Sequence, residues 1–436
     1  MHYPRFLAFN FAAAIAFICL VANITFLFGK NLDDTLRFFH MFRLAGLIVA
    51  VLLVTSFLYR FYQQKKHLYK KLGVKIITAT LAASLLLGFV FYAVSGALII
   101  LPRTSGQAGY THGSIGGAEF DVQQGFISSI DDKNLLITAL GKPILEFKES
   151  GQPASINVTI RNIQARRTLV QSSSLAQQPL ILDDLTLFFR IALNPSHSTL
   201  VTLKSKATRD HFLFAITADT HDAGPIFTQM IESINHDAPS FLILAGDFVK
   251  HGRKRGYRTF LDQISRLKVP LYTAKGSQEL SAGGEKISRK LFAPYHYSFV
   301  YQNSLFIIID TFSLPKNDDY LTWLAGEVKK GEKSQNIFLI TYSVPLNDKR
   351  FTEIMARSHI RTVYAVKAIG EYLPVIQGVP YVLLEQRSGE PFFYKVVTVK
   401  GLMTFEENVP VIPEHLTIID KASLAIDKLV TKIMPH

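Results

Sequence analysis

The chain has 436 residues, 48% of them apolar, and a formal net charge of +13. This length allows two soluble domains and a membrane segment. The charge at first favours a nucleic-acid partner, but residues 1–101 carry +8 of it and the remaining 335 residues only +5. We therefore expect no nucleic-acid partner. Cys19 is the only cysteine of the sequence, so disulfides and thiol chemistry are excluded from the rest of the chain.

Three apolar runs begin the chain, at about residues 6–28, 41–62 and 74–101. Each is long enough for a helix to cross the hydrocarbon core, which takes about 20 residues. We predict that residues 1–101 form a three-helix transmembrane segment. A cleaved signal peptide is the alternative for the first run, but that run is long for a signal peptide and lacks a clear cleavage site.

The loop between the second and third runs predicts the orientation. Residues 60–73 contain five Lys or Arg and no acid, and such loops stay in the cytoplasm. With three spans, everything after Leu101 then lies outside the cytoplasm. In a bacterium we expect a multi-pass inner-membrane protein with periplasmic soluble domains and the lipid bilayer as a partner. Binding of anionic lipid head groups is a second interpretation of this basic loop, although orientation alone explains it.

Two segments separate the membrane runs from the C-terminal part. Residues 102–126 are rich in Gly, Ser and Thr, which predicts a flexible linker. Residues 127–208 contain short runs of alternating apolar and polar residues with many β-branched side chains, the pattern of strands. We predict a small antiparallel β-sandwich of about immunoglobulin size and find no chemical motif in it.

From residue 209 the pattern changes to alternating strands and helices, which indicates a layered α/β domain. Asp219 and His221 follow one buried apolar run, and Asp247 follows the next. In open α/β sheets, sites form beyond the carboxyl ends of the strands. Carboxylate and imidazole groups suit divalent ions, so these three residues are candidate metal ligands.

The ordered motifs resemble the calcineurin-like metallophosphoesterase family, which has Asp-x-His, then Gly-Asp, then Gly-Asn-His followed by an acid. Here Asp219-Thr220-His221, Gly246-Asp247 and Gly276-Ser277-Gln278-Glu279 stand in that order. The resemblance covers about residues 212–385 and implies a four-layer α/β/β/α domain over residues 209–402. It also implies metal-dependent hydrolysis of phosphoesters, with Asp219, His221 and Asp247 among the metal ligands.

The sequence departs from the family at the other functional positions. Ser277 and Gln278 replace a metal-binding Asn and a His that assists the leaving group. Neutral serine is a poor ligand, and glutamine transfers no proton near neutral pH. Ser343 stands where the fourth motif has a histidine, and residues 360–375 lack the two histidines of the last motif. We expect at most one divalent ion (Mn, Fe, Zn or Mg) and leave the catalytic role of Ser277, Gln278 and Glu279 unassigned.

A basic run follows the second motif. Arg253, Lys254 and Arg255 are candidates for binding an anionic group, by guanidinium forks and ammonium charge. A solvated surface loop is the alternative.

The chain ends in residues 403–436, where apolar residues from Leu416 to Ile433 follow a helical stripe. We predict an amphipathic helix that packs on its own domain. A partner helix or the membrane surface is the alternative.

Two functional hypotheses follow from the sequence. In the first, the protein is a pseudoenzyme that binds a protein partner or a phosphorylated, anionic ligand outside the cytoplasm, without a cofactor. In the second, Asp219, His221 and Asp247 hold one ion that activates water, and the protein hydrolyses an envelope or lipid-linked phosphoester. The missing ligands favour the first hypothesis.

Overall fold

The computed structural model describes most of the chain after residue 108: residues 109–206, 210–221, 224–292, 294–310, 319–369, 374–386 and 391–411. The predicted membrane spans at residues 6–28, 41–62 and 74–101 lie outside this part. Among the helices of the described residues, none has the length and apolarity needed to cross a membrane.

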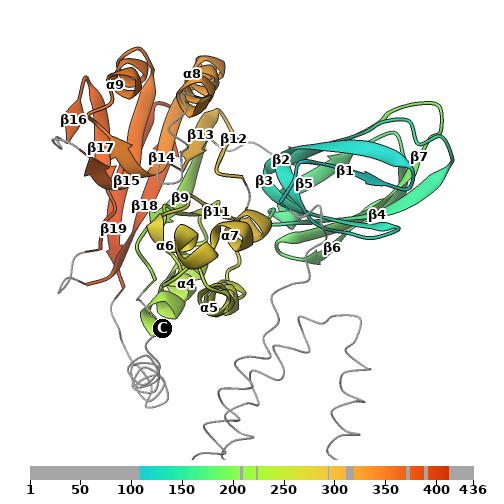
Figure 1. Ribbon diagram of the computed structural model, residues 1–436, viewed down its shortest axis with the longest axis horizontal. Helices are drawn as coiled ribbons and strands as arrows, with labels where there is room; N and C mark the ends of the chain where they lie inside the picture. Colours follow the sequence, from blue (N-terminus) through green and yellow to red (C-terminus); the bar gives the residue numbers. More distant parts are fainter. Residues whose placement is uncertain are drawn as a thin grey trace, which may run out of the picture. The chain divides into compact units, whose positions relative to one another are not determined.

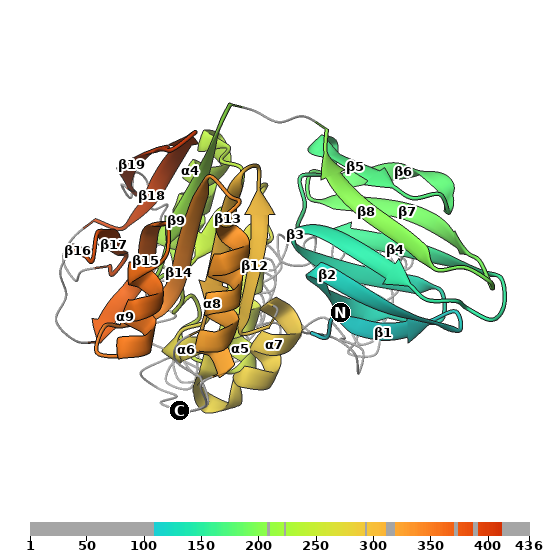
Figure 2. The same ribbon diagram turned by 90° about the horizontal axis from the view of Figure 1, so that it is seen from above.

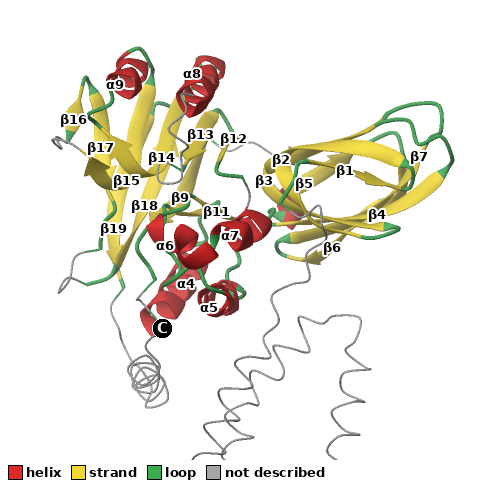
Figure 3. Ribbon diagram, viewed as in Figure 1, coloured by secondary structure: helices red, strands yellow, loops and turns green. Residues whose placement is uncertain are grey.

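The first domain, which we call the β-sheet domain, is built almost wholly of strands (Figure 3). They form one folded eight-stranded sheet in the order β1-β2-β3-β4-β7-β6, with β8 also paired to β3 and β5 paired to β8. Strand β3 pairs in parallel with β4 through its first half and antiparallel with β8 through its second half, so the sheet folds around one core. The strands are β1 (His112–Ile115), β2 (Ala118–Ile130), β3 (Asn134–Phe147), β4 (Ala154–Arg161), β5 (Thr168–Gln171), β6 (Leu175–Asp183), β7 (Thr186–Leu193) and β8 (Thr199–Ser205).

The predicted linker at residues 102–126 is wrong over much of its length, because β1 and the first part of β2 lie in it. Gly116 and Gly117 both have positive φ and form the turn that pairs these strands as a hairpin. The glycines that suggested a linker therefore serve a tight turn. The antiparallel interpretation of the domain also needs correction, since the β3–β4 pair is parallel.

The C-terminal domain contains two sheets. A five-stranded sheet has the order β11-β10-β9-β18-β19, and a six-stranded sheet has the order β12-β13-β14-β15-β17-β16. The strands of the first are β9 (His211–Thr217), β10 (Leu242–Leu244), β11 (Leu271–Thr273), β18 (Phe393–Lys400) and β19 (Met403–Pro410). Those of the second are β12 (His296–Tyr301), β13 (Ser304–Ile309), β14 (Asn336–Pro345), β15 (Ile360–Ile369), β16 (Val375–Ile376) and β17 (Val379–Leu383).

Three apolar cores arrange this domain in layers (Figure 1). The central core lies between the two sheets and is rich in aromatic rings, among them Phe214 and Phe306 at 5.2 Å between centroids. A second core joins the five-stranded sheet to its helices, and a third joins the six-stranded sheet to α8 and α9. The α/β class predicted for this domain is thus confirmed. The helices are α4 (Pro225–Asp237), α5 (Lys254–Ile264), α6 (Ser277–Leu280), α7 (Glu285–Phe292), α8 (Asp319–Gly331) and α9 (Lys349–Ala356).

The predicted helix at residues 403–436 is wrong at its start. Residues 403–410 form β19, which turns back from β18 through Gly401 and pairs with it along its whole length. The alternating sequence of this segment pairs with a neighbouring edge, and that pairing determines its structure. The helical stripe from Leu416 to Ile433 lies outside the described residues.

The β-sheet domain and the C-terminal domain share packing. Phe126 and Leu140 of the β-sheet domain belong to the central core of the C-terminal domain, and β12 contacts β2 and β3 (Figure 2). Gly141 makes this approach possible, because an added Cβ there would lie 2.8 Å from Cβ of Phe299. Asn162 adds a polar contact: its amide donates to the carbonyl of Leu271 at 2.8 Å and its carbonyl accepts from the Leu271 N–H at 2.7 Å.

Candidate functional site

The ends of β9 and β10 bring the first two motifs together. These strands pair in parallel, with Thr217 opposite Leu244, and the chain then enters two adjacent loops. The N–H of Asp219 donates to the carbonyl of Gly246 at 3.0 Å, and the N–H of His221 donates to the carbonyl of Asp247 at 3.1 Å. Two apolar parallel strands with polar residues beyond their carboxyl ends produce this arrangement.

Both aspartates have left-handed backbone conformations, with φ of 56° at Asp219 and 50° at Asp247. Such conformations cost about 1–3 kcal/mol at a residue other than glycine and persist only where the surroundings impose them. Aspartate adopts them more readily than most residues, and here both aspartates turn the chain just beyond the strand ends.

The imidazole of His221 lies between the two loops. Its Nδ1 is 2.9 Å from Oδ1 of Asp219 and 3.3 Å from the carbonyl oxygen of Asp247. Both side chains of the His221–Asp219 pair are about one-fifth to one-quarter exposed. The structure therefore brings together the three residues predicted as metal ligands, while their role as ligands stays a prediction.

The carboxylate of Asp247 is almost fully engaged by hydrogen-bond donors of the protein. Oδ1 accepts from the N–H of Gln278 at 2.9 Å, and Oδ2 accepts from the hydroxyl of Tyr342 at 2.7 Å. The Ser277 hydroxyl lies 3.3 Å from each oxygen and 2.9 Å from the Tyr342 hydroxyl. Gly276 allows this packing, because a Cβ there would lie 2.4 Å from Oδ1 of Asp247. Asp247 is thus satisfied by the protein's own donors.

Glu279, the acid of the third motif, holds the backbone of the site in place. Its side chain is fully buried and accepts from the N–H groups of Asp247, Phe248, Val249 and Gly276 at 2.7–2.9 Å. Burial raises the pKa of Glu279 to about 7, with a further contribution from the charge of Asp247, although the N–H donors oppose the rise. Glu279 is therefore a positioning residue that fixes the loop after β10.

Two residues that the sequence did not single out complete the site. Tyr342 comes from β14 and Lys367 from the neighbouring strand β15, where Lys367 pairs in register with Ser343. The Lys367 ammonium lies over the Tyr342 ring, 4.5 Å from its centroid. Partial burial opposes the charge of Lys367, but the Tyr342 hydroxyl and the carboxylates of Asp247 and Asp219 outweigh it and raise the pKa of this lysine.

Comparison with known proteins identifies the fold that carries this site. Residues 212–377 match the family model described as calcineurin-like phosphoesterase. They belong to the calcineurin-like phosphoesterase family. No curated protein matches the chain.

Several solved structures are similar to this calcineurin-like domain. A dimetal phosphatase from Danio rerio is 9% identical, covering 46% of this chain and 96% of its own, with a TM-score of 0.40. An archaeal phosphodiesterase is 13% identical, covering 45% and 99%, with a TM-score of 0.28. Yfce, a phosphoesterase from E. coli, is 10% identical, covering 46% and 100%, with a TM-score of 0.26.

The family implies a pair of divalent ions. The residues at the ligand positions show whether this chain can hold such a pair. Among the described residues, no group of three or more His, Cys, Asp or Glu side chains is arranged to hold a metal ion. The position of the family's asparagine holds Ser277, whose hydroxyl is turned to Asp247. Strand β15 brings the cation of Lys367 near the same carboxylates, in the part of the fold where the family has its last histidines. These residues do not fit the two-metal centre of the calcineurin-like family.

The predicted anion-binding residues lie at the start of α5. Arg253 is the residue before the helix, and Lys254 and Arg255 are in its first turn. All three are exposed, and no ion pair or hydrogen bond joins their side chains to any residue that the structure describes. The structure thus places Lys254 and Arg255 in a helix and not in the surface loop of the alternative interpretation, and their binding role stays a prediction.

Proposed function

We propose that this protein is a membrane-anchored pseudoenzyme of the calcineurin-like family, which binds an anionic ligand at the inherited site without a metal ion. One observation carries the proposal: the carboxylate of Asp247 accepts hydrogen bonds from Gln278 and Tyr342 and from the hydroxyl of Ser277. A carboxylate prepared for two ions would keep its oxygens open to them. Here the protein's own donors satisfy them.

The cation of Lys367 supports an anionic ligand. Lys367 supplies a positive charge close to Asp247 and Asp219, and its side chain is exposed. An exposed ammonium offers donors to a phosphate group. A phosphorylated small molecule or a phosphorylated partner protein fits this chemistry.

The hydrolase is the second candidate, and one observation favours it. Asp219, His221 and Asp247 remain side by side on strained loops, with 2.9 Å between the Asp219 and His221 side chains. In this candidate the three residues bind one divalent ion that activates water for attack on a phosphoester.

The location belongs to the same proposal and rests on the sequence. Three apolar runs within residues 1–101, with a basic loop at residues 60–73, support a three-span anchor. We propose the bacterial inner membrane, with both domains on the periplasmic side and substrates or ligands of the cell envelope.

The experiment uses the full-length chain purified in detergent, with metal content measured by mass spectrometry and hydrolysis of bis(p-nitrophenyl) phosphate assayed in added Mn²⁺. The pseudoenzyme proposal expects neither bound metal nor turnover, in the wild type and in Asp247→Asn alike. The exposed residue Asp132 provides the control variant, Asp132→Asn. The pseudoenzyme proposal would be overturned, and the hydrolase supported, by metal-dependent turnover that is lost in Asp247→Asn and kept in Asp132→Asn.

A further inference from the structure

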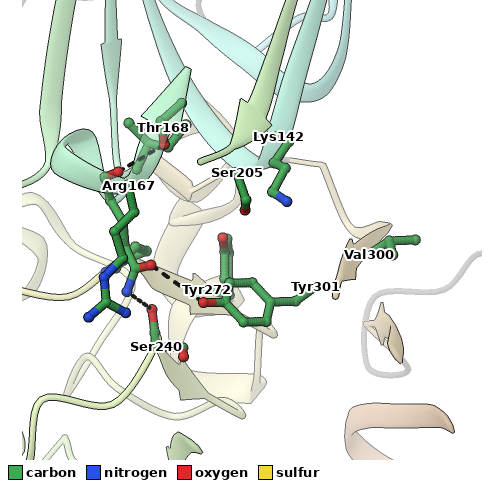
Figure 4. A pocket seen from close by; sticks show the side chains of 12 residues that line it. Lys142, Arg167, Thr168, Ser205, Ser240, Tyr272, Val300 and Tyr301 are labelled. Atoms are coloured by element: carbon green, nitrogen blue, oxygen red, sulfur yellow. Dashed lines mark hydrogen bonds between the residues drawn. The ribbon is translucent and has the colours of Figure 1, made fainter. Parts of the chain in front are cut away.

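A small cavity lies where the β-sheet domain meets the C-terminal domain (Figure 4). Its volume is ≈ 30 Å³, and it is lined from both domains, with Lys142, Arg167 and Ser205 on one side and Tyr272 and Tyr301 on the other. One water occupies about 10–15 Å³ on this scale, so the cavity has room for a small ion or the end group of a ligand.

The charges on its lining are all of one sign. None of the twelve lining residues is acidic, and two of them, Lys142 and Arg167, are basic. Neither of these two side chains makes an ion pair or a hydrogen bond to a described residue. The adjacent Arg166 provides a contrast, because its Nε lies 3.0 Å from Asp184 on the surface. Two cations without an ion pair thus line one partly open cavity, with Lys142 half-buried and Arg167 exposed.

Lys142 is half-buried, and Figure 4 shows its side chain extending toward the tyrosines. Burial lowers the pKa of Lys142, with no neighbouring acid to offset the effect. A desolvated cation without a partner is unfavourable, and an anion bound beside it would remove that cost.

Hydroxyl donors complete the lining. Tyr272 is 4% exposed, and its hydroxyl makes no hydrogen bond to any residue in the described ranges. The opposite wall is fixed, since the Tyr301 hydroxyl donates to Oε1 of Gln164 at 3.4 Å and Nε2 of Gln164 donates to the carbonyl of Ser240 at 3.0 Å. A phenol, a guanidinium and an ammonium can all donate hydrogen bonds, and an oxyanion supplies acceptor oxygens for them.

We propose that this cavity is a binding site for a small oxyanion, free phosphate or the phosphate end of an ester, held by Lys142 and Arg167 with the hydroxyl of Tyr272. The site is separate from the one at Asp247, so it does not depend on the pseudoenzyme proposal. Its position at the junction means that a bound oxyanion contacts both domains at once.

The test is isothermal titration of the full-length protein with inorganic phosphate and, separately, with glycerol phosphate, at constant ionic strength maintained with chloride. Binding of inorganic phosphate identifies the free ion as sufficient, whereas binding of glycerol phosphate alone assigns the site to an ester. We expect Lys142→Met and Arg167→Met each to weaken the binding at least tenfold. Arg166→Met is the matched control, and we expect it to bind as the wild type does.

A further variant separates the two sites. Lys367→Met alters the site at Asp247 and leaves the cavity intact, so it should bind phosphate as tightly as the wild type at the cavity. The proposal is overturned if neither anion binds at concentrations up to tens of millimolar, or if the binding survives in both Lys142→Met and Arg167→Met. Arg167 is exposed, so its variant remains informative even if Lys142→Met fails to fold.

Discussion

Replacement of Lys367 by methionine should raise the affinity of the site for a divalent ion. The methionine keeps an unbranched side chain and removes the charge that lies near Asp247 and Asp219. The Lys367 ammonium is 4.5 Å from the Tyr342 ring centroid, and the Tyr342 hydroxyl is 2.7 Å from Oδ2 of Asp247. An ion bound by Asp247 would therefore lie close to this ammonium.

The magnitude follows from Coulomb's law. At a separation of about 6 Å, with an effective dielectric constant of about 40–80 because Lys367 is exposed, a single and a double positive charge repel by about 1.4–2.8 kcal/mol. Removal of the ammonium should then raise the affinity for Mn²⁺ by roughly 10-fold to 100-fold.

The assay is a calorimetric titration of the full-length protein with Mn²⁺. Lys367→Arg keeps the charge and should bind Mn²⁺ as weakly as the wild type, and Lys349→Met removes an exposed lysine elsewhere and should have no effect. Equal Mn²⁺ affinities of Lys367→Met and the wild type would refute the reasoning, since they would show that the ammonium does not oppose an ion at this site.

Two further predictions concern buried charges. Glu279→Gln replaces two acceptor oxygens by one and directs an amide N–H toward backbone donors. Urea denaturation should therefore show that the free energy of unfolding falls by about 3 kcal/mol or more. A loss below about 1 kcal/mol would contradict the role of Glu279 as a positioning residue. Lys275 is 1% exposed, and burial lowers its pKa to about 8, against the attraction of Asp310. Above pH 8 the folded protein binds fewer protons at Lys275 than the unfolded chain does, so stability rises with pH. Between pH 8 and pH 10, the free energy of unfolding of the wild type should therefore increase by on the order of 2 kcal/mol more than that of Lys275→Met. Parallel curves of stability against pH for the two proteins would show that Lys275 is not desolvated.

The sequence predicts those parts of the site that depend on local order along the chain. Asp219 and Asp247 each follow an apolar strand, and parallel strands place such residues at one edge of the sheet, which the structure shows. Tyr342 and Lys367 could not be found in this way. Tyr342 lies between Thr341 and Ser343 near the end of a buried strand, and its hydroxyl reaches Asp247 only because the two sheets pack against each other. A lysine near the end of β15, where the family has histidines, was a signal that sequence reasoning could have used.

Contacts between residues distant in sequence also explain the wrong predictions at the domain borders. Gly116 and Gly117 are equally compatible with a linker and with a hairpin turn, and the pairing of β1 with β2 decides between them. Residues 403–410 precede an apolar stripe, but their pairing with β18 makes them a strand. Partners distant in sequence determine both outcomes.

Because Phe126 and Leu140 belong to the core of the C-terminal domain, the two domains depend on each other for stability. A fragment that begins at residue 209 would lack both side chains and leave the other members of this core less covered. Such a fragment should be prone to aggregation, and a recombination event that exchanged one domain alone would carry the same penalty. In evolution, the two domains should therefore be transmitted together as a single module.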